Sequence, residues 1–112
     1  MKSYFFAVMC LSVLMACSSG MPESAKTTEL KVWGNCGMCK KTIEKSLDGS
    51  DGVLNADWNK DTKMMTLSYD TLKTSVAKVE ELIAASGYDT QSLSANDEAY
   101  AGLHECCKYD RK

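Results

Sequence analysis

Cys36 and Cys39 are the residues whose type and spacing point most directly to chemistry. The apolar periodicity that follows them predicts a helix just after this pair, and a helix N-terminus lowers the pKa of nearby thiols. Lys40 and Lys41 add positive charge, and Met38 lies between the two cysteines. Two thiolates at this spacing can hold one soft ion, since two sulfurs suffice for Cu(I) whereas Zn(II) prefers four ligands. We therefore expect a metal-binding loop here.

A second group of potential ligands consists of His104, Cys106 and Cys107. The two adjacent cysteines are poor candidates for a mutual disulfide, because consecutive Cα atoms lie about 3.8 Å apart and a disulfide usually needs about 4.4–6.8 Å. A short helix predicted over 96–103 would carry them back toward the first cysteine pair. We hypothesise that this tail supplies extra ligands to one site. The alternatives are an exposed reactive tail or a structural disulfide to the loop.

The first residues are typical of a bacterial lipoprotein signal. Lys2 precedes an apolar run, Tyr4–Ala16, which is too short to span a bilayer as a helix but suits a signal-peptide core. The segment 14–17 (LMAC) resembles a lipobox, which predicts a signal peptide over 1–16 and acylation, for example with palmitate, of Cys17.

This signal predicts a membrane-anchored protein that faces the periplasm or the cell surface. In a Gram-negative cell, Ser18 in place of Asp would permit sorting to the outer membrane. The small and polar segment 17–28 is expected to be a lipidated tether. A domain over 29–94 and a cysteine-rich tail over 95–112 would follow.

Alternating and helical periodicities in the domain predict an α+β fold. Strands are expected over 29–33, 54–58, 65–69 and 90–93, and helices over 40–47 and 76–83, with Gly87 stopping the second helix. This βαββαβ order predicts a ferredoxin-like sandwich, in which an antiparallel four-stranded sheet carries two helices on one face.

Four segments carry a resemblance to a known family: 34–47 (GNCGMCKKTIEKSL), 52–53 (GV), 69–70 (YD) and 84–89 (AASGYD). Over about 29–93 the chain resembles the heavy-metal-associated domain family, which includes copper chaperones, N-terminal modules of copper ATPases and periplasmic mercury-binding proteins. The resemblance implies that Cys36 and Cys39 are the ligands and that Tyr88 lies near the metal loop. Cu(I) is the first expectation, with Zn(II), Hg(II) and Cd(II) as alternatives.

The sequence departs from the family at one position beside the loop. The family usually has a methionine two residues before the first cysteine, packed inward, whereas this chain has Gly34 there and Met38 between the cysteines. The likeness also implies a docking partner, such as a metal efflux component or a cuproprotein. Transfer, sequestration and sensing of the metal are all compatible with it.

Two other functions fit the cysteines less well. A thiol-disulfide redox protein could carry the same Cys-Gly-x-Cys motif, but the one proline, Pro22, precedes the motif and the strand order differs from that of thioredoxin. A disulfide-stapled interaction module remains the other alternative. No general acid–base pair or nucleophilic constellation is present, so we do not expect an enzyme. A net charge of −2 without a basic patch argues against nucleic acid as a partner.

Overall fold

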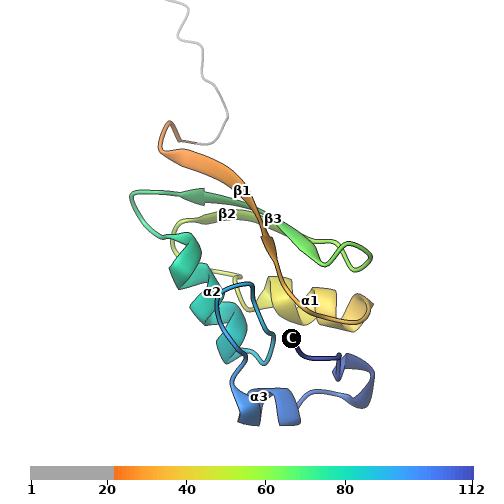
Figure 1. Ribbon diagram of the computed structural model, residues 1–112. Coiled ribbons are helices and arrows are strands. Elements are labelled where there is room, and N and C mark those ends of the chain that lie inside the picture. Colours follow the sequence, from red (N-terminus) through yellow and green to blue (C-terminus); the bar gives the residue numbers. More distant parts are fainter. Residues whose placement is uncertain (1–21) are drawn as a thin grey trace, which may run out of the picture.

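The computed structural model describes residues 22–112, and its centre is a three-stranded antiparallel sheet (Figure 1). The strands are β1 (Ala25–Lys31), β2 (Val53–Trp58) and β3 (Met64–Asp70), in the spatial order β1-β3-β2. The predicted signal peptide, its cleavage site and the acylated cysteine lie outside the described residues.

One row across the sheet shows how the sequence pattern places the core. Met65 on β3 lies opposite Leu30 on β1 and opposite Trp58 on β2. All three side chains are buried, because alternate residues of a strand face the same side of a sheet. The apolar alternation that predicted these strands therefore marks the face on which the helices pack.

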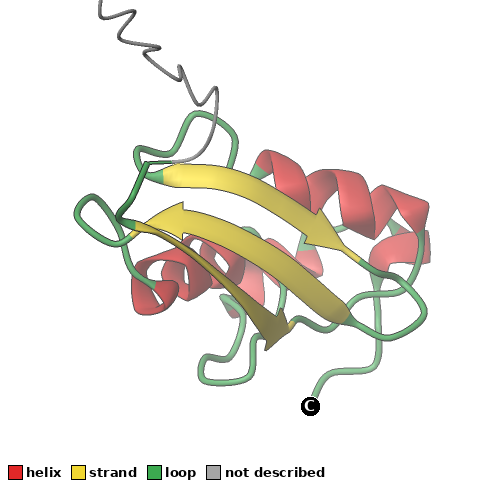
Figure 2. Cartoon of the chain, turned by 90° about the horizontal axis from the view of Figure 1, so that it is seen from above, coloured by secondary structure: helices red, strands yellow, loops and turns green. Residues whose placement is uncertain are grey.

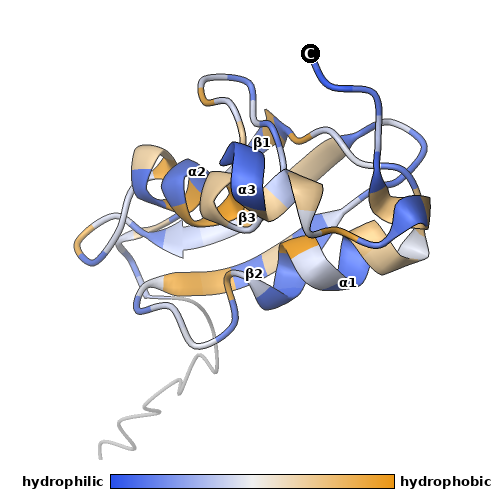
Figure 3. Cartoon of the chain, turned by 90° about the horizontal axis from the view of Figure 1, so that it is seen from below, coloured by the Kyte–Doolittle hydropathy of each residue, from blue (hydrophilic) through white to orange (hydrophobic). Residues whose placement is uncertain are grey.

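Two helices, α1 (Gly37–Lys45) and α2 (Val76–Ala85), cover that face of the sheet (Figure 2). Their inward positions include Ile43 and Ile83, both fully buried. Hydrophobic and hydrophilic residues alternate along both helices in Figure 3, which is typical of helices that bury one side. The two predicted helices and their common face are thus confirmed, and the architecture is ferredoxin-like.

The fourth predicted strand is reduced to a single bridge between Val32 and Thr90. The backbone N–H of Thr90 donates to the carbonyl of Leu93 at 2.8 Å, so the chain turns locally instead of continuing along β1. The Thr90 hydroxyl donates to Glu80 at 2.7 Å and holds this turn on α2. Side-chain hydrogen bonds of this kind compete with strand pairing, and the periodicity of 90–93 did not reveal them.

The first strand begins earlier than the sequence indicated. β1 starts at Ala25, which pairs with Asp70, so part of the segment expected to be a tether belongs to the sheet. Its outer end is polar, and the hydroxyls of Thr27 and Ser68 hydrogen-bond across the strands at 2.9 Å. A strand that pairs through hydroxyls lacks the apolar alternation on which the prediction rested.

After α2 the chain continues through α3 (Asp97–Ala101) and a 3-10 turn, η1 (Glu105–Cys107). The predicted short helix is confirmed, and Asn96 caps it by accepting a hydrogen bond from the Ala99 N–H. α3 packs against the end of α2 at Gly87, whose φ of 104° ends that helix. A Cβ atom at Gly87 would lie 2.9 Å from the Ala99 backbone, so only glycine permits this approach. Within 22–112, no helix has the length and apolar character needed to cross a membrane.

Candidate metal centre

The first cysteine pair lies at the start of α1, which begins at Gly37 and therefore earlier than the predicted residue 40. Cys36 is the N-cap residue in an extended conformation, and its carbonyl accepts the first helical hydrogen bond, from the Lys40 N–H, at 3.1 Å. Cys39 lies in the first turn and is fully buried, whereas Cys36 is partly exposed. One cysteine is therefore open to an incoming ion and the other is set into the core.

The Trp58 side chain packs beside Gly34 and supports this loop. A Cβ atom at Gly34 would lie 2.7 Å from Cη2 of the Trp58 indole and 3.4 Å from Cβ of Cys39, so the ring occupies the space beside the glycine. The indole N–H donates to the Val32 carbonyl at 2.9 Å, which fixes the ring. The family usually has an inward-packed methionine at this position. This chain has Gly34 there, and the buried indole of Trp58 from β2 fills the space that the missing side chain leaves.

The helix N-terminus acts on the Cys36 thiol. The backbone N–H of Cys39, and next that of Met38, lowers the pKa of Cys36 below its ordinary value, as expected of a sulfur at a helix start, although the Cys36 side chain makes no capping hydrogen bond. Lys40 acts elsewhere, because its ammonium contacts Glu44 at 2.7 Å and Asp57 at 2.6 Å and ties α1 to β2. Lys40 was expected to add positive charge beside the thiols, but its ammonium pairs with these two carboxylates instead.

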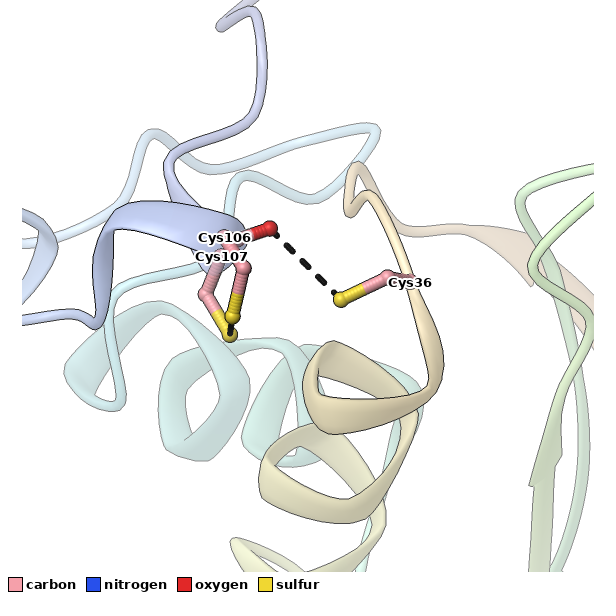
Figure 4. Close-up of side chains that lie close together, drawn as sticks. All are labelled: Cys36, Cys106 and Cys107. Carbon is pink, nitrogen blue, oxygen red and sulfur yellow. Dashed lines mark hydrogen bonds between the residues drawn. The ribbon is translucent and has the colours of Figure 1, made fainter.

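The tail brings its cysteines to this loop. The Sγ atoms of Cys36, Cys106 and Cys107 all lie within 4.8 Å of one another (Figure 4). Cys36 points toward η1, and its thiol donates to the Cys106 carbonyl at 3.5 Å. The Cys39 thiol donates to the Cys107 carbonyl at 3.9 Å, and all four cysteines are free thiols. The predicted return of the tail to the loop is thus present in the structure.

Not every predicted residue takes part in this cluster. Met38 does approach it, with its Sδ atom 3.4 Å from Sγ of Cys106. His104 is the N-cap of η1 and is exposed, and it is not one of the residues whose ligand atoms converge. Cys39 is also not one of the converging residues, so among the described residues the group consists of Cys36, Cys106 and Cys107, without Cys39 and without the histidine.

Aromatic stacking holds the tail in place. Tyr109 stacks on Tyr88 with ring centroids 5.5 Å apart, and Tyr100 meets Tyr109 edge-on at 5.1 Å. The Tyr109 hydroxyl donates to the Gly87 carbonyl at 2.9 Å and accepts the Asp89 N–H at 2.8 Å. These contacts join the tail to the end of α2.

Ion pairs add to that anchoring. The Arg111 guanidinium pairs with the buried Asp89 at 3.0 Å and with Asp97 at 2.7 Å. The Lys112 ammonium donates to the Thr90 carbonyl at 2.6 Å. Neither Tyr109 nor Arg111 was predicted from the sequence, although two tyrosines and an arginine in the tail were an available signal of docking.

Tyr88 lies on the inner side of the cysteines, near Cys39, as the family likeness implied. It is fully buried, and its hydroxyl has no hydrogen-bond partner among the described residues. Burial, and after it the neighbouring Cys39 thiol, raises the pKa of Tyr88 well above its ordinary value. A protonated, unpaired hydroxyl in this position is suited to donate to a sulfur that has lost its proton.

The donor set of this centre is soft. Three thiols converge, and the Cys39 thiol and the Met38 thioether lie beside them. Thiolates and thioethers are the ligand types that select Cu(I), and thiolates also suit Zn(II). Burial, and after it the neighbouring Cys39 thiol, raises the pKa of Cys107 to about 12. Cys107 is therefore protonated near neutral pH unless an ion displaces the proton. The residues present fit a soft metal ion.

Comparison with known proteins places this chain among metal-handling proteins. The family described as "Heavy-metal-associated domain" matches residues 35–89. The copper chaperone CopZ of Staphylococcus aureus (strain JH9) is 36% identical over 55 residues, which make up 49% of this chain and 81% of that protein.

Solved structures give the same picture for the fold. The N-terminal domain of a potential copper-translocating P-type ATPase from Bacillus subtilis, solved in the Cu(I)-loaded state, is 30% identical and has a TM-score of 0.56. The match covers 59% of this chain and 84% of that one. Oxidised MerP from Ralstonia metallidurans CH34 is 31% identical with a TM-score of 0.56, over 60% of this chain and 94% of that one. The family match ends at residue 89, so Cys106 and Cys107 lie beyond it.

Proposed function

Because the chain belongs to the heavy-metal-associated domain family, we propose that it binds Cu(I) through Cys36 and Cys39, as a carrier or store of the ion rather than as an enzyme. The observation that carries the proposal is the position of the two thiols. They lie at the start of α1, one partly exposed with a lowered pKa and the other buried under the loop.

We name Cu(I) as the metal because of the chemistry of the ligands and because of the similar proteins. Thiolates and a thioether suit Cu(I), and two of the similar proteins are named for copper. Zn(II), Cd(II) and Hg(II) also bind thiolates and are the competitors in any test. Each thiol gives up its proton on binding, so the affinity of the site for the ion rises with pH.

We further propose that this domain lies outside the cytoplasm, attached to a membrane through acyl chains on Cys17. The motif at 14–17 supports that location, and the segment up to β1 would separate the domain from the lipid surface. In such a position the protein would take Cu(I) from, or pass it to, an efflux transporter or a cuproprotein. Membrane fractionation of a bacterium that expresses the chain tests this part, since C17S should release the protein from the membrane.

The binding itself is tested with the full chain in a C10S/C17S background, which leaves the four described cysteines as the only thiols. The reduced protein is titrated anaerobically with Cu(I) against a chromophoric chelator. We expect tight binding that C36S/C39S weakens by more than about 100-fold, because loss of mere supporting groups already costs about 10- to 100-fold at metal sites. Failure of the reduced protein to compete with the chelator would refute the proposal.

A further inference from the structure

The sulfurs of the tail lie where further ligands to the same ion would be needed. Sγ of Cys106 and Sγ of Cys107 are 3.9 Å apart, and Sγ of Cys36 completes a group within 4.8 Å. An ion that binds each thiolate at about 2.3 Å separates two sulfurs by about 3.8 Å in tetrahedral geometry and about 4.6 Å in linear geometry. The spacing therefore suits a shared ion without a large movement of the backbone.

We propose that Cys106 and Cys107 are ligands of the Cu(I) centre. The ion would then be held by three or more thiolates, and Cys36 would belong both to the loop pair and to the group formed with the tail. This inference rests on the proposed function, and it adds to the family's two-cysteine motif a ligand pair from outside the family match.

The tail is built to hold these two residues in place. Cys107 is 2% exposed and Tyr109, two residues later, is also 2% exposed. The Asn35 side-chain amide donates to the Cys106 carbonyl at 3.2 Å, which ties η1 directly to the loop before Cys36. Groups that are held in position before the ion arrives lose little conformational entropy on binding, and this raises affinity.

Met38 adds a reason to expect copper at this enlarged site. Its thioether lies against Cys106, on the partly exposed side of the cluster. Thioethers are ligands for Cu(I), whereas Zn(II) is bound in proteins by thiolates, imidazoles and carboxylates. The one histidine, His104, is not among the converging groups. The donors around the ion would then all be sulfur.

Binding requires no oxidant or reductant. Each cysteine that coordinates the ion forms a Cu–S bond and releases its thiol proton to the solvent, and copper stays as Cu(I) throughout. A centre of three thiolates on one Cu(I) carries net negative charge. The positive end of α1, at whose N-cap Cys36 lies, is placed to offset part of that charge.

The consequence for function is retention of the ion. A partner protein that takes the metal must replace ligands one at a time, and here the tail adds ligands and lies over the loop. Release would therefore require the loss of tail ligands as well as loop ligands. The enlarged site favours storage or slow delivery over rapid exchange.

The test uses thiol alkylation of the full C10S/C17S chain, read by mass spectrometry with and without Cu(I). Cys106 is exposed in the structure, so it should react readily in the metal-free protein. We expect Cu(I) to protect Cys106 together with Cys36, and the protection of Cys106 to vanish in C36S/C39S. If Cu(I) protects Cys36 while Cys106 stays reactive, the inference is wrong but the proposed function stands. If neither residue is protected, both are wrong.

Affinity gives an independent readout. C106S/C107S should bind Cu(I) at least about 10-fold more weakly than the parent chain, which is the lower end of the cost of losing a supporting group at a metal site. C106S alone guards against a folding defect, since Cys106 is exposed and Cys107 is buried. H104A is the matched control, because His104 lies on the same turn outside the sulfur cluster, and its affinity should be unchanged. Equal affinities for C106S, C106S/C107S and the parent would overturn the inference.

Discussion

The Sδ atom of Met38 lies 3.4 Å from Sγ of Cys106, although 68 positions separate the two residues along the chain. The contact joins the loop between the two motif cysteines to the 3-10 turn of the tail. It places a thioether beside three converging thiols, and so it bears on both the identity of the metal and the number of ligands.

Replacement of Met38 by leucine should separate copper from zinc. M38L keeps a similar apolar volume and removes the sulfur, so we expect Cu(I) affinity to fall by about 10-fold, as for loss of a supporting group, while Zn(II) affinity stays the same. Paired competition titrations with the two ions measure this. A fall that is equal for both metals would indicate that Met38 acts through packing alone.

Alanine at Gly34 should destabilise the domain. The new Cβ atom would lie 2.7 Å from the Trp58 indole, which is fixed by its hydrogen bond to Val32 and cannot move aside freely. Overpacking of this kind costs about 1–3 kcal/mol, and urea denaturation would show it as a lower midpoint. G37A is the control, because no heavy atom other than those of its chain neighbours and its own helix backbone lies within 4 Å of its Cβ position. Equal midpoints for the two variants would rule out support of the loop by Trp58.

The Tyr109 hydroxyl should be needed for docking of the tail. Y109F keeps the ring that stacks on Tyr88 but leaves the Asp89 N–H and the Gly87 carbonyl without their partner. Loss of a partner for a buried polar group costs about 1–3 kcal/mol, which denaturation would measure. Because the tail carries Cys106 and Cys107, we also expect weaker Cu(I) binding. Unchanged stability and unchanged affinity would together contradict the anchoring role.

Acid should weaken the same anchor through Asp89. Burial by itself would raise the pKa of this carboxyl, but hydrogen bonds from Arg111 and from backbone N–H groups outweigh burial and hold it below its ordinary value of 3.8. A depressed pKa means that the carboxylate stabilises the fold fully above 3.8 and that this contribution is lost as pH falls further.

D89N should therefore be less stable than the parent at neutral pH and should lose less stability on acidification below that value. The free energy of unfolding measured from pH 7 down to about pH 2 would show the difference. Asp70, whose pKa is also lowered, chiefly by the Ser24 hydroxyl, should leave some acid sensitivity in the variant. Parallel pH profiles for the two proteins would count against the ion pair.

Much of the fold could be predicted from the sequence because periodic burial determines it. The inward residues of the strands and helices, such as Leu30, Ile43 and Ile83, recur at the spacing that each element requires. The prediction of a fourth strand was wrong for a local reason. Thr90 bonds to Leu93 and Glu80 in a turn, which no apolar pattern encodes.

The site was predictable in part, and for a different reason. Cys36 and Cys39 follow from motif and position, whereas the approach of Cys106 and Cys107 was a hypothesis from the length of a short helix. Their placement depends on Tyr109, which contacts residues about twenty positions earlier. Long-range packing of this kind has no signature in local spacing, and so the contact between Met38 and the tail could not be foreseen.

X-ray absorption at the copper edge of the anaerobically loaded full chain, in the C10S/C17S background, would show whether sulfur atoms of this chain capture Cu(I). We predict sulfur neighbours only, three or more in the parent chain and fewer in C106S/C107S, with no nitrogen from His104. Nitrogen or oxygen neighbours in the parent chain, or the same spectrum in C36S/C39S as in the parent, would contradict it.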